Sequence, residues 1–366
     1  MTRRRRAATI ADVAALADVS VGTASKALNG RGQLRAETRE RVHAAAQKLG
    51  FYPNALAQNL LAGRSFTVGL ITTDSFGRFT IPIMLGVEDA LGAGQISVFM
   101  CDARDDPIRE QHYVRTLLGR RVDGIIVTGR RADPRAPIAA NLPVPVVYAM
   151  TQSTDPDDCS VAPDDEAGGR MAMAHLLATG RTRIGHITGP ERFLAARLRA
   201  RGASDVLDDA GHALVAPGTL YGEWREEWGR QATHILLRMN ADLDAIFCGS
   251  DQIARGVSDA LRESGRRVPE DVALVGYDNW EVVAGACRPP LTTVDMNLPQ
   301  LGRYAAAKLL AAIDGQPAHG LHTLPCQLVI RESTRAAAAV RRGVPPTRSG
   351  NISEVSAAAV PATPNR

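Results

Sequence analysis

The sequence has few aromatic residues, few cysteines and no long apolar run. Aromatic residues make up only 4% of the 366 residues, so the core has to be built mainly from Ala, Leu, Val and Ile. The 5 cysteines are scattered without a CxxC pair, which argues against a disulfide framework or a structural zinc site. No apolar run reaches the ~18 residues that a membrane span requires, and the basic start of the chain does not resemble a secretory signal. We therefore expect a protein of the reducing cytoplasm.

Sequence motifs that support catalysis or nucleotide binding are also missing. Gly92 begins a GxG, but it follows an expected helix and lacks the third glycine of a dinucleotide-binding loop. Gly315 and Gly320 have the spacing of a Walker motif, but the required Lys and Ser or Thr do not follow them. No HExxH and no GxSxG occurs in the chain. We therefore expect no enzymatic activity, no cofactor and no metal site.

The charge is unevenly distributed along the chain. Residues 1–66 carry 11 Lys or Arg against 4 Asp or Glu, and residues 336–366 carry 4 Arg against 1 Glu. The segment between them carries 28 basic and 34 acidic residues, although the whole chain has a net charge of +4. A basic head on an acidic body indicates a nucleic-acid module joined to a second module. The alternative is a solvated basic tail without a partner.

The first 50 residues predict three short helices, at 10–17, 20–28 and 36–49. Ser20 is placed to cap the second helix, and Gly50 ends the third. A short connection between the first two helices is typical of a helix-turn-helix, whose second helix lies in the major groove with its N-terminal residues at the base edges. Lys26 is the one long donor on that helix, and a lysine can pair with guanine. The alternative is a small helical packing module.

From residue 66 onward, short apolar runs alternate with amphipathic helices. Strands are expected at 67–71, 96–100, 124–127, 144–148, 183–187, 245–248 and 272–275. Helices are expected at 82–92, 109–118, 167–179, 194–210, 231–239, 252–264 and 298–313. Such alternation predicts parallel sheets covered on both faces, here enough for two doubly wound lobes with a ligand in the cleft between them. The composition after Arg335 predicts a disordered tail.

Several motifs together resemble the LacI/GalR family of transcriptional regulators. The first are TIADVA at 9–14 and VSVGTASKALN at 19–29, followed by TRERV at 38–42 and LGFYPNALAQNL at 49–60. Shorter motifs follow in the family's order at 189–190, 196–199, 250–252, 275–278 and 290–294. The resemblance implies an all-α helix-turn-helix headpiece (1–53, with the motif at about 10–29), a hinge helix (54–64) and a two-lobed α/β body with parallel sheets, like periplasmic binding proteins (65–335). Residues 336–366 would be the disordered tail.

The resemblance also assigns residues that contact DNA. Those matching phosphate-binding positions are Thr9, Ser20, Thr23, Ser25, Asn29, Tyr52 and Asn54. Val21, Gly22 and Lys26 match base-reading positions, although Lys26 replaces the family's usual Arg and Gly22 offers no side chain. In the hinge, Leu60 matches the leucine that is inserted between base pairs in the minor groove, and Ala57 permits close approach. Without the resemblance, Leu60 would be a core residue.

A second set of residues matches the family's effector-binding positions. These are Thr73, Asp74, Phe79, Arg104, Thr128, Arg199, Trp224, Ser250 and Asp278. Arg199 would offer a planar donor fork, Asp278 would accept from ligand hydroxyls, and Trp224 would stack on a sugar, with Trp228 as its rival. Each of these residues could instead pack a lobe or lie on the surface. Ser250 stands where the family usually has Asn or Asp, and Met150 stands where it usually has Asp.

The sequence therefore predicts a cytoplasmic, nucleoid-associated homodimer that regulates transcription, most simply as a repressor. It would bind a near-palindromic double-stranded operator, with a small carbohydrate-like effector between the lobes and no membrane partner. A solute-binding protein of a transporter would explain the body but not the head. A Rossmann dehydrogenase would need a phosphate-binding glycine loop after a strand, which the sequence does not have.

Overall fold

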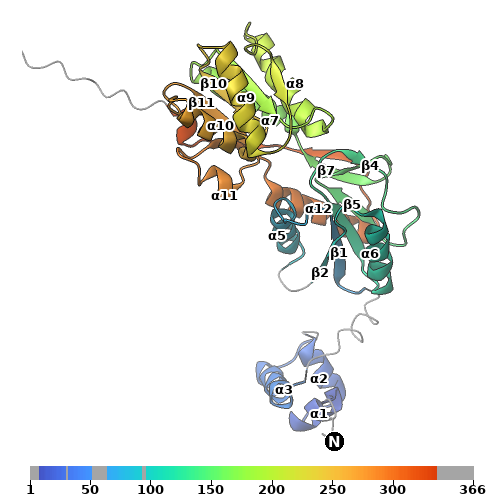
Figure 1. Ribbon diagram of the computed structural model, residues 1–366. Helices are drawn as coiled ribbons and strands as arrows, with labels where there is room; N and C mark the ends of the chain where they lie inside the picture. Colours follow the sequence, from blue (N-terminus) through green and yellow to red (C-terminus); the bar gives the residue numbers. More distant parts are fainter. Residues whose placement is uncertain (1–7, 30–31, 52–63, 93–95, 336–366) are drawn as a thin grey trace, which may run out of the picture.

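The computed structural model describes residues 8–29, 32–51, 64–92 and 96–335. The described residues form a group of three helices at the N-terminus and a body of two lobes (Figure 1). The predicted hinge at 54–64, apart from its last residue, and the predicted tail at 336–366 lie outside the described residues.

The N-terminal group consists of α1 (Ile10–Leu16), α2 (Val21–Leu28) and α3 (Ala36–Leu49), so the three expected helices are confirmed. Two of the helix ends are fixed by local chemistry, because the side chain of Ser20 caps the start of α2 and Gly50 adopts a left-handed conformation after α3. The three helices meet around a small core in which Val13, Ala24 and Val42 are fully buried.

The first lobe of the body is built on a fully parallel six-stranded sheet with the order β13-β7-β5-β3-β1-β2. In chain order its strands are β1 (Thr67–Thr72), β2 (Ser97–Asp102), β3 (Gly124–Thr128), β5 (Val146–Ala149), β7 (Cys159–Pro163) and β13 (Gly320–Leu324). Its helices are α5 (Thr80–Ala90), α6 (Pro107–Gly119) and α12 (Leu298–Ile313). A small ladder joins β4 (Pro134–Arg135) to β6 (Gln152–Ser153).

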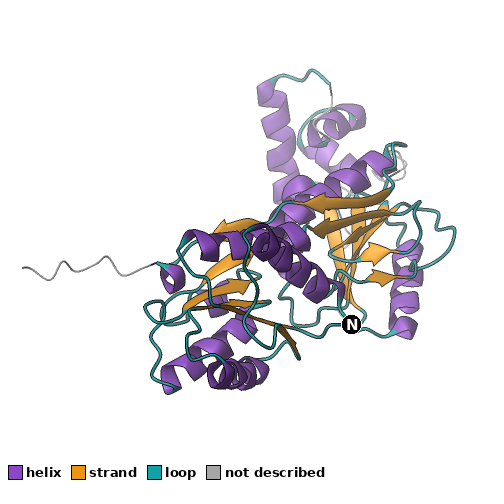
Figure 2. Ribbon diagram, turned by 90° about the horizontal axis from the view of Figure 1, so that it is seen from above, coloured by secondary structure: helices purple, strands orange, loops and turns teal. Residues whose placement is uncertain are grey.

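The second lobe is built on a sheet with the order β14-β12-β11-β10-β8-β9, in which only the β12–β14 pair is antiparallel. Its strands are β8 (Ile184–Thr188), β9 (Thr219–Tyr221), β10 (Ala245–Cys248), β11 (Ala273–Tyr277), β12 (Thr292–Asp295) and β14 (Gln327–Val329). Its helices are α7 (Asp165–Ala178), α8 (Leu194–Asp209), α9 (Glu226–Met239), α10 (Asp251–Glu263), α11 (Glu281–Ala284) and η1 (Glu332–Thr334). Figure 2 shows helices on both sides of the strands.

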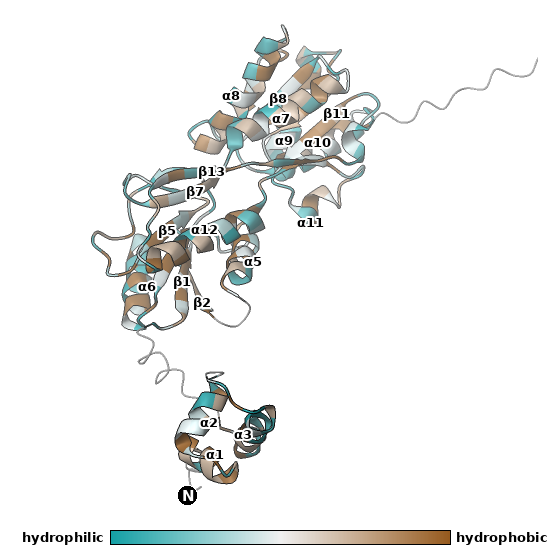
Figure 3. Ribbon diagram, turned by 180° about the vertical axis from the view of Figure 1, so that it is seen from behind, coloured by the Kyte–Doolittle hydropathy of each residue, from teal (hydrophilic) through white to brown (hydrophobic). Residues whose placement is uncertain are grey.

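Three helix pairs in the body pack closely because each helix presents a glycine to the other. In the α5–α12 pair, a Cβ on Gly86 would clash with the carbonyl oxygen of Pro299, and one on Gly302 would clash with that of Ile83. The α7–α8 and α9–α10 pairs repeat this reciprocal arrangement. The covering helices carry both hydrophobic and hydrophilic residues, as their mixed colours in Figure 3 show.

The predicted alternation of strands and helices is confirmed, and so is the division into two lobes with parallel sheets. The prediction omitted β7, β12, β13 and β14, which adjoin the three segments where the chain passes between the lobes. These strands are short, and β13 alternates between half-buried and exposed residues. β13 pairs with β7, which is distant in sequence, whereas β7 and β12 also pair with the nearby strands β5 and β11. Within the described residues, none of the helices is long and apolar enough to cross a membrane.

Candidate functional site

The first residues of α2 form an exposed surface on the N-terminal group. Val21 is the first residue of the helix and is 49% exposed, although Ala24 and Ala27 on the same helix are buried. Lys26 is exposed one turn further along. The hydroxyl of Ser20 accepts a hydrogen bond from the amide of Thr23 at 3.1 Å. The helix therefore exposes an apolar group at its first residue and a cation in its last turn, away from the buried alanines.

Gly22 has no packing role within this N-terminal group. A Cβ at this position would meet only the Ser20 hydroxyl at 3.8 Å, and the residue lies inside a regular helix. Glycine inside a helix costs about 1 kcal/mol relative to alanine. Because nothing in the described residues requires a glycine here, the open space at Gly22 suits close approach by another molecule.

Three further predicted DNA-binding residues cap these helices. Thr9 and Asp12 form a capping box at the start of α1, with the Thr9 hydroxyl donating to the Asp12 carboxylate at 2.7 Å. Asn29 ends α2 and donates to the Ser25 hydroxyl at 3.2 Å. These residues fix the helix ends that flank the exposed surface. The four remaining predicted residues, Tyr52, Asn54, Ala57 and Leu60, lie outside the described residues.

The predicted effector residues follow the carboxyl ends of strands in both lobes, where open parallel sheets bind ligands. Thr73 and Asp74 follow β1, Arg104 follows β2, Thr128 ends β3, Trp224 follows β9, Ser250 follows β10 and Asp278 follows β11, whereas Phe79 precedes α5 and Arg199 lies on α8. The structure brings Arg199, Trp224 and Asp278 together in the second lobe, and Arg78 links this group to the first lobe.

Arg199 is the centre of a buried polar cluster. Its side chain is 4% exposed, and its guanidinium donates to Asp165 at 2.8 Å and to the carbonyl oxygen of Gly249 at 2.6 Å. It also lies 3.5 Å from Asp278 and 3.6 Å above the ring of Tyr277. Although burial disfavours its charge, the two carboxylates hold the pKa of Arg199 above its usual value. Arg199 thus stabilises the second lobe as well as facing the boundary.

Asp278 projects into this boundary from a strained backbone position. Its φ is 103°, in a region that residues other than glycine rarely adopt. One carboxylate oxygen lies beside Arg199, and the other forms a buried ion pair with Arg78 of the first lobe. Burial raises the pKa of Asp278, and the two arginines oppose that shift. Both oxygens of this predicted acceptor are therefore engaged within the protein.

Arg78 is a residue that the sequence analysis missed. It lies between β1 and α5 and reaches the second lobe, where it donates to Gln252 at 2.8 Å in addition to pairing with Asp278. Its guanidinium carbon lies 4.9 Å from the ring centre of Phe79 and 4.5 Å from that of Trp280. The only signal in the sequence was its position directly before Phe79 in a loop that follows a strand.

Asp251, at the start of α10, is a second residue that the sequence analysis missed. It is fully buried and accepts hydrogen bonds from the Thr293 hydroxyl at 2.6 Å and from the Trp280 amide at 2.7 Å. Burial, followed by the nearby charge of Asp278, raises the pKa of Asp251 to about 7, against the effect of these hydrogen bonds and of Arg78. The residue belongs to the motif at 250–252, so its importance was visible but its role was not.

Other predicted effector residues have local roles or lie apart from this cluster. Asp74 accepts from the amides of Phe79 and Thr80 and so holds the start of α5. Ser250 caps α10, and its neighbour Gly249 contacts Arg199. Arg104 has a side chain that is 66% exposed and pairs with Asp102.

The remaining predicted effector residues, and the rival of Trp224, lie in or near the strand ends of the two sheets. Trp224 lies 5.8 Å from the guanidinium of Arg199, measured to the ring centre, and therefore borders the cluster. Trp228 donates to the carbonyl oxygen of Thr188 and packs with the core of the second lobe. Thr128 is buried, and its hydroxyl has no hydrogen-bond partner among the described residues. Thr73 is half-buried next to Gly129, which follows Thr128.

A second contact joins the lobes at the start of α8. Asp133 of the first lobe accepts from the amide of Leu194 at 2.8 Å. The guanidinium of Arg131, also in the first lobe, lies 5.1 Å from the ring centre of Phe193. Polar and aromatic contacts thus join the lobes through Arg78 and through the segment at 131–133, in addition to a hydrophobic cluster that includes residues of both lobes.

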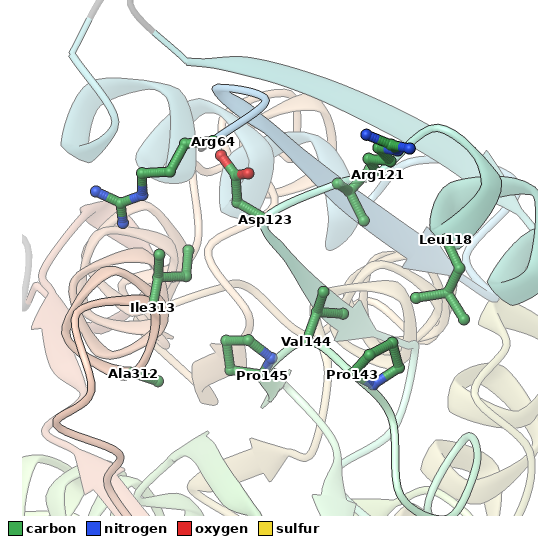
Figure 4. Close-up of a pocket in the computed structure, with 10 residues that line it drawn as sticks. Arg64, Leu118, Arg121, Asp123, Pro143, Val144, Pro145, Ala312 and Ile313 are labelled. Atoms are coloured by element: carbon green, nitrogen blue, oxygen red, sulfur yellow. The ribbon is translucent and has the colours of Figure 1, made fainter. Parts of the chain in front are cut away.

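A cavity of about 470 Å³ lies at the other end of the first lobe (Figure 4). Residues that precede β1, β3 and β5 line it, together with the ends of α6 and α12. It therefore lies at the amino edge of the sheet, where Arg64 pairs with Asp314 at 3.0 Å. Because ligands of such sheets bind at the carboxyl edge, this cavity is not the candidate effector site.

Comparison with known families matches both parts of the chain. Residues 9–54 match the model of bacterial regulatory proteins of the lacI family. Residues 173–334 match the model of a periplasmic binding protein-like domain. The two matches correspond to the N-terminal helices and to most of the second lobe.

Full-length relatives show the same combination. The HTH-type transcriptional regulator CelR of Thermobifida fusca is 35% identical over 339 residues, which are 90% of this chain and 99% of the relative. The HTH-type transcriptional repressor CytR of Escherichia coli is 31% identical over 337 residues, or 91% of this chain and 98% of the relative. Among solved structures, a lac repressor dimer bound to operator and the anti-inducer ONPF has a TM-score of 0.72 and 31% identity and covers 90% of this chain and 100% of its own. A CelR–cellobiose complex has a TM-score of 0.63 and 33% identity and covers 89% and 99%.

Proposed function

The chain belongs to the LacI family of bacterial transcriptional regulators, and we propose that it represses transcription under the control of a small carbohydrate-like effector. In this proposal the protein acts in the cytoplasm as a homodimer on a near-palindromic operator. The N-terminal helices are the headpiece, residues 54–64 are the hinge and the two lobes from residue 65 are the effector-binding body. The domain limits are those predicted from the sequence.

The observation that carries the DNA-binding role is the exposed start of α2. A helix-turn-helix presents the first residues of its second helix to the base edges. Val21, Gly22 and Lys26 occupy that surface with an apolar group, an open space and a cation. We assign base reading to these three residues, because a methyl group on thymine and the acceptors of guanine suit them. Thr9, Ser20, Thr23, Ser25 and Asn29 would position the headpiece on phosphates.

The effector role rests on the cluster around Arg199 and Asp278. In the second lobe, the guanidinium of Arg199 on α8 and the carboxylate of Asp278 after β11 can bind the hydroxyls of a sugar, and aromatic rings lie on both sides of the boundary. A related solved structure is a complex with cellobiose, which makes a neutral disaccharide a suitable first ligand to test.

Homodimer formation is supported by exposed apolar residues on the first lobe. Phe99 and Met100 are exposed on β2, which is the edge strand of its sheet, and Ile81 and Leu85 are exposed on α5. An apolar edge strand is a template for pairing with another chain. A second copy that covers α5 and β2 would bury these residues and bring two headpieces to one operator.

Deletion of residues 1–63 tests the division of roles. The truncated protein should lose all specific binding to duplexes selected by the full chain from a randomised library, as measured by gel shift. It should still fold and bind the effector, because Arg64 and the cores of both lobes remain. If the truncated body still bound the selected duplexes, the assignment of DNA reading to the headpiece would be wrong.

A further inference from the structure

The guanidinium of Arg78 lies among the residues of the effector site proposed above. It lies between the rings of Phe79 and Trp280 and engages one carboxylate oxygen of Asp278, whose other oxygen faces Arg199. Its remaining contact is a hydrogen bond to Gln252 at 2.8 Å. A sugar bound here would need the same aromatic face and the same acceptor, so Arg78 and the sugar cannot both occupy this position.

We propose that Arg78 is a built-in competitor of the effector. In the effector-free protein it fills the position between Phe79, Trp280 and Asp278, and the effector binds by displacing it. Because the first lobe contributes Arg78 and the second lobe contributes its partners, this contact also ties the lobes together. The inference rests on the effector site proposed above.

The contacts of Arg78 hold it in this position, but one of its hydrogen-bond donors has no acceptor among the described residues. Its side chain is 13% exposed, and its Nε is buried without a hydrogen-bond partner among the described residues. An unsatisfied buried donor costs about 1–3 kcal/mol, which weakens the hold of the protein on this side chain. The preceding turn contains Gly77 with a φ of 71° and Phe76, which is 94% exposed. The turn therefore lies at the surface, so a displaced side chain can reach solvent.

Displacement of Arg78 selects the chemical class of the effector. Without this cation, Asp278 and Asp165 share only Arg199 as a close positive partner. A neutral ring that donates hydroxyls to Asp278 and lays a flat apolar face on Trp280 can replace the guanidinium. A sugar phosphate or sugar acid would bring a negative charge next to Asp278, which is unfavourable in a site of low polarity. We therefore expect neutral sugars to bind and their anionic derivatives to bind more weakly.

The first experiment uses the Arg78→Ala variant of the full chain and N-ethylguanidinium, which has the atoms that this substitution removes. The compound should bind the variant saturably at low concentration and quench the fluorescence of Trp280, because the planar cation returns to the aromatic position. It should not bind the wild type, in which Arg78 fills the position. The control is Arg267→Ala, which removes an exposed arginine that pairs with Asp271 of the same lobe. N-ethylguanidinium should not bind this variant either. Equal behaviour of the two variants would overturn the proposal.

The second experiment measures sugar affinity by isothermal titration with cellobiose as the probe. If Arg78 fills the position in about nine molecules of ten, its removal should tighten sugar binding by about tenfold. Arg78→Lys keeps a cation but loses the planar fork, so its affinity should lie between those of the wild type and Arg78→Ala. Weaker binding by Arg78→Ala would show that Arg78 contacts the effector, which contradicts competition. If neither protein binds the sugar while N-ethylguanidinium still binds the variant, the neutral-sugar effector is wrong and the competition at this position stands.

Discussion

The headpiece exposes its candidate base-reading residues, whereas the body buries the pair at the centre of its candidate site. Val21, Gly22 and Lys26 lie on the surface of α2 and make no contact on which the headpiece core depends. Arg199 and Asp278 are almost completely buried and are bound to other parts of the protein. The headpiece can therefore separate DNA reading from folding stability, but the body uses the same side chains for both.

This difference follows from what each part binds. The operator is large and lies outside the protein, so a few side chains on one helix suffice to read it. A small effector has to be surrounded, and a surrounding site places charged groups where they must be paired in the absence of ligand. The ion pair between Arg78 and Asp278 shows how the body supplies such a partner itself.

The largest expected effect is that of Arg199→Ala, which breaks a buried ion pair. The substitution leaves Asp165 and Asp278 without their shared cation, so the free energy of unfolding of the body should fall by about 3–5 kcal/mol. The response of operator binding to effector should disappear as well. Urea denaturation followed by circular dichroism measures the first effect, and gel shifts with and without effector measure the second.

Arg197→Ala is the matched control for this prediction. Arg197 lies on the same helix, is exposed, and donates only to the carbonyl oxygens of Glu191 and Arg192. Its loss should change stability by about 0.5 kcal/mol or less. If Arg199→Ala were as mild as this control, the body would not depend on its functional residues for stability, and the contrast with the headpiece would be lost.

The second prediction concerns the pH dependence of stability through Asp251. This residue has a pKa of about 7 in the folded body, against 3.8 in the reference state. Between these values the folded protein holds a proton that the unfolded chain has released, so the contribution of Asp251 to stability falls as pH rises from about 4 to about 7. The loss is about 1.4 kcal/mol for each pH unit over which the two states differ in protonation.

Comparison with Asp251→Asn isolates this contribution, because an amide cannot titrate. The difference in unfolding free energy between wild type and variant should shrink across that pH range and stay constant above it. Denaturation curves at several pH values measure it. A difference that does not change with pH would mean that Asp251 is charged throughout.

The contrast between the headpiece and the body also explains which parts of the structure the sequence predicted. The sequence signals for the headpiece helices are local, because residues such as Ser20 and Gly50 lie next to the apolar positions of the helix that each one begins or ends. The bounds of these helices were therefore predicted within one residue. The alternation of the body was also local, but β13 pairs with β7 across more than 150 residues and was missed. Arg78 and Asp278 are 200 residues apart, and only the folded lobes bring them together. The periodicity of apolar residues does not predict which distant segments pair with one another.

The third prediction returns to the headpiece, where function and stability should separate. Lys26→Ala should weaken binding to the best operator by about 1–3 kcal/mol and relax the preference at one base pair in each half-site. The melting temperature of the headpiece should hardly change, because Lys26 is exposed. Quantitative gel shifts on a set of single-base operator variants measure the effect. Lys48→Ala, at the exposed end of α3, serves as the control and should leave base preference unchanged. Uniform weakening on all sequences would make Lys26 a phosphate contact.

The smallest expected effect is that of Gly22→Ala, and it should act on stability and function in opposite directions. A methyl group here meets open space, so the headpiece should become more stable by about 0.5–1 kcal/mol. The same methyl group occupies space that we assign to the base edges, so operator affinity should fall. Gly119→Ala is the matched control, because Gly119 ends α6 in the body and its Cβ would also meet open space. That variant should keep wild-type operator affinity in a gel shift. If Gly22→Ala did the same, the glycine would have no role in DNA reading, which would be left to Val21 and Lys26.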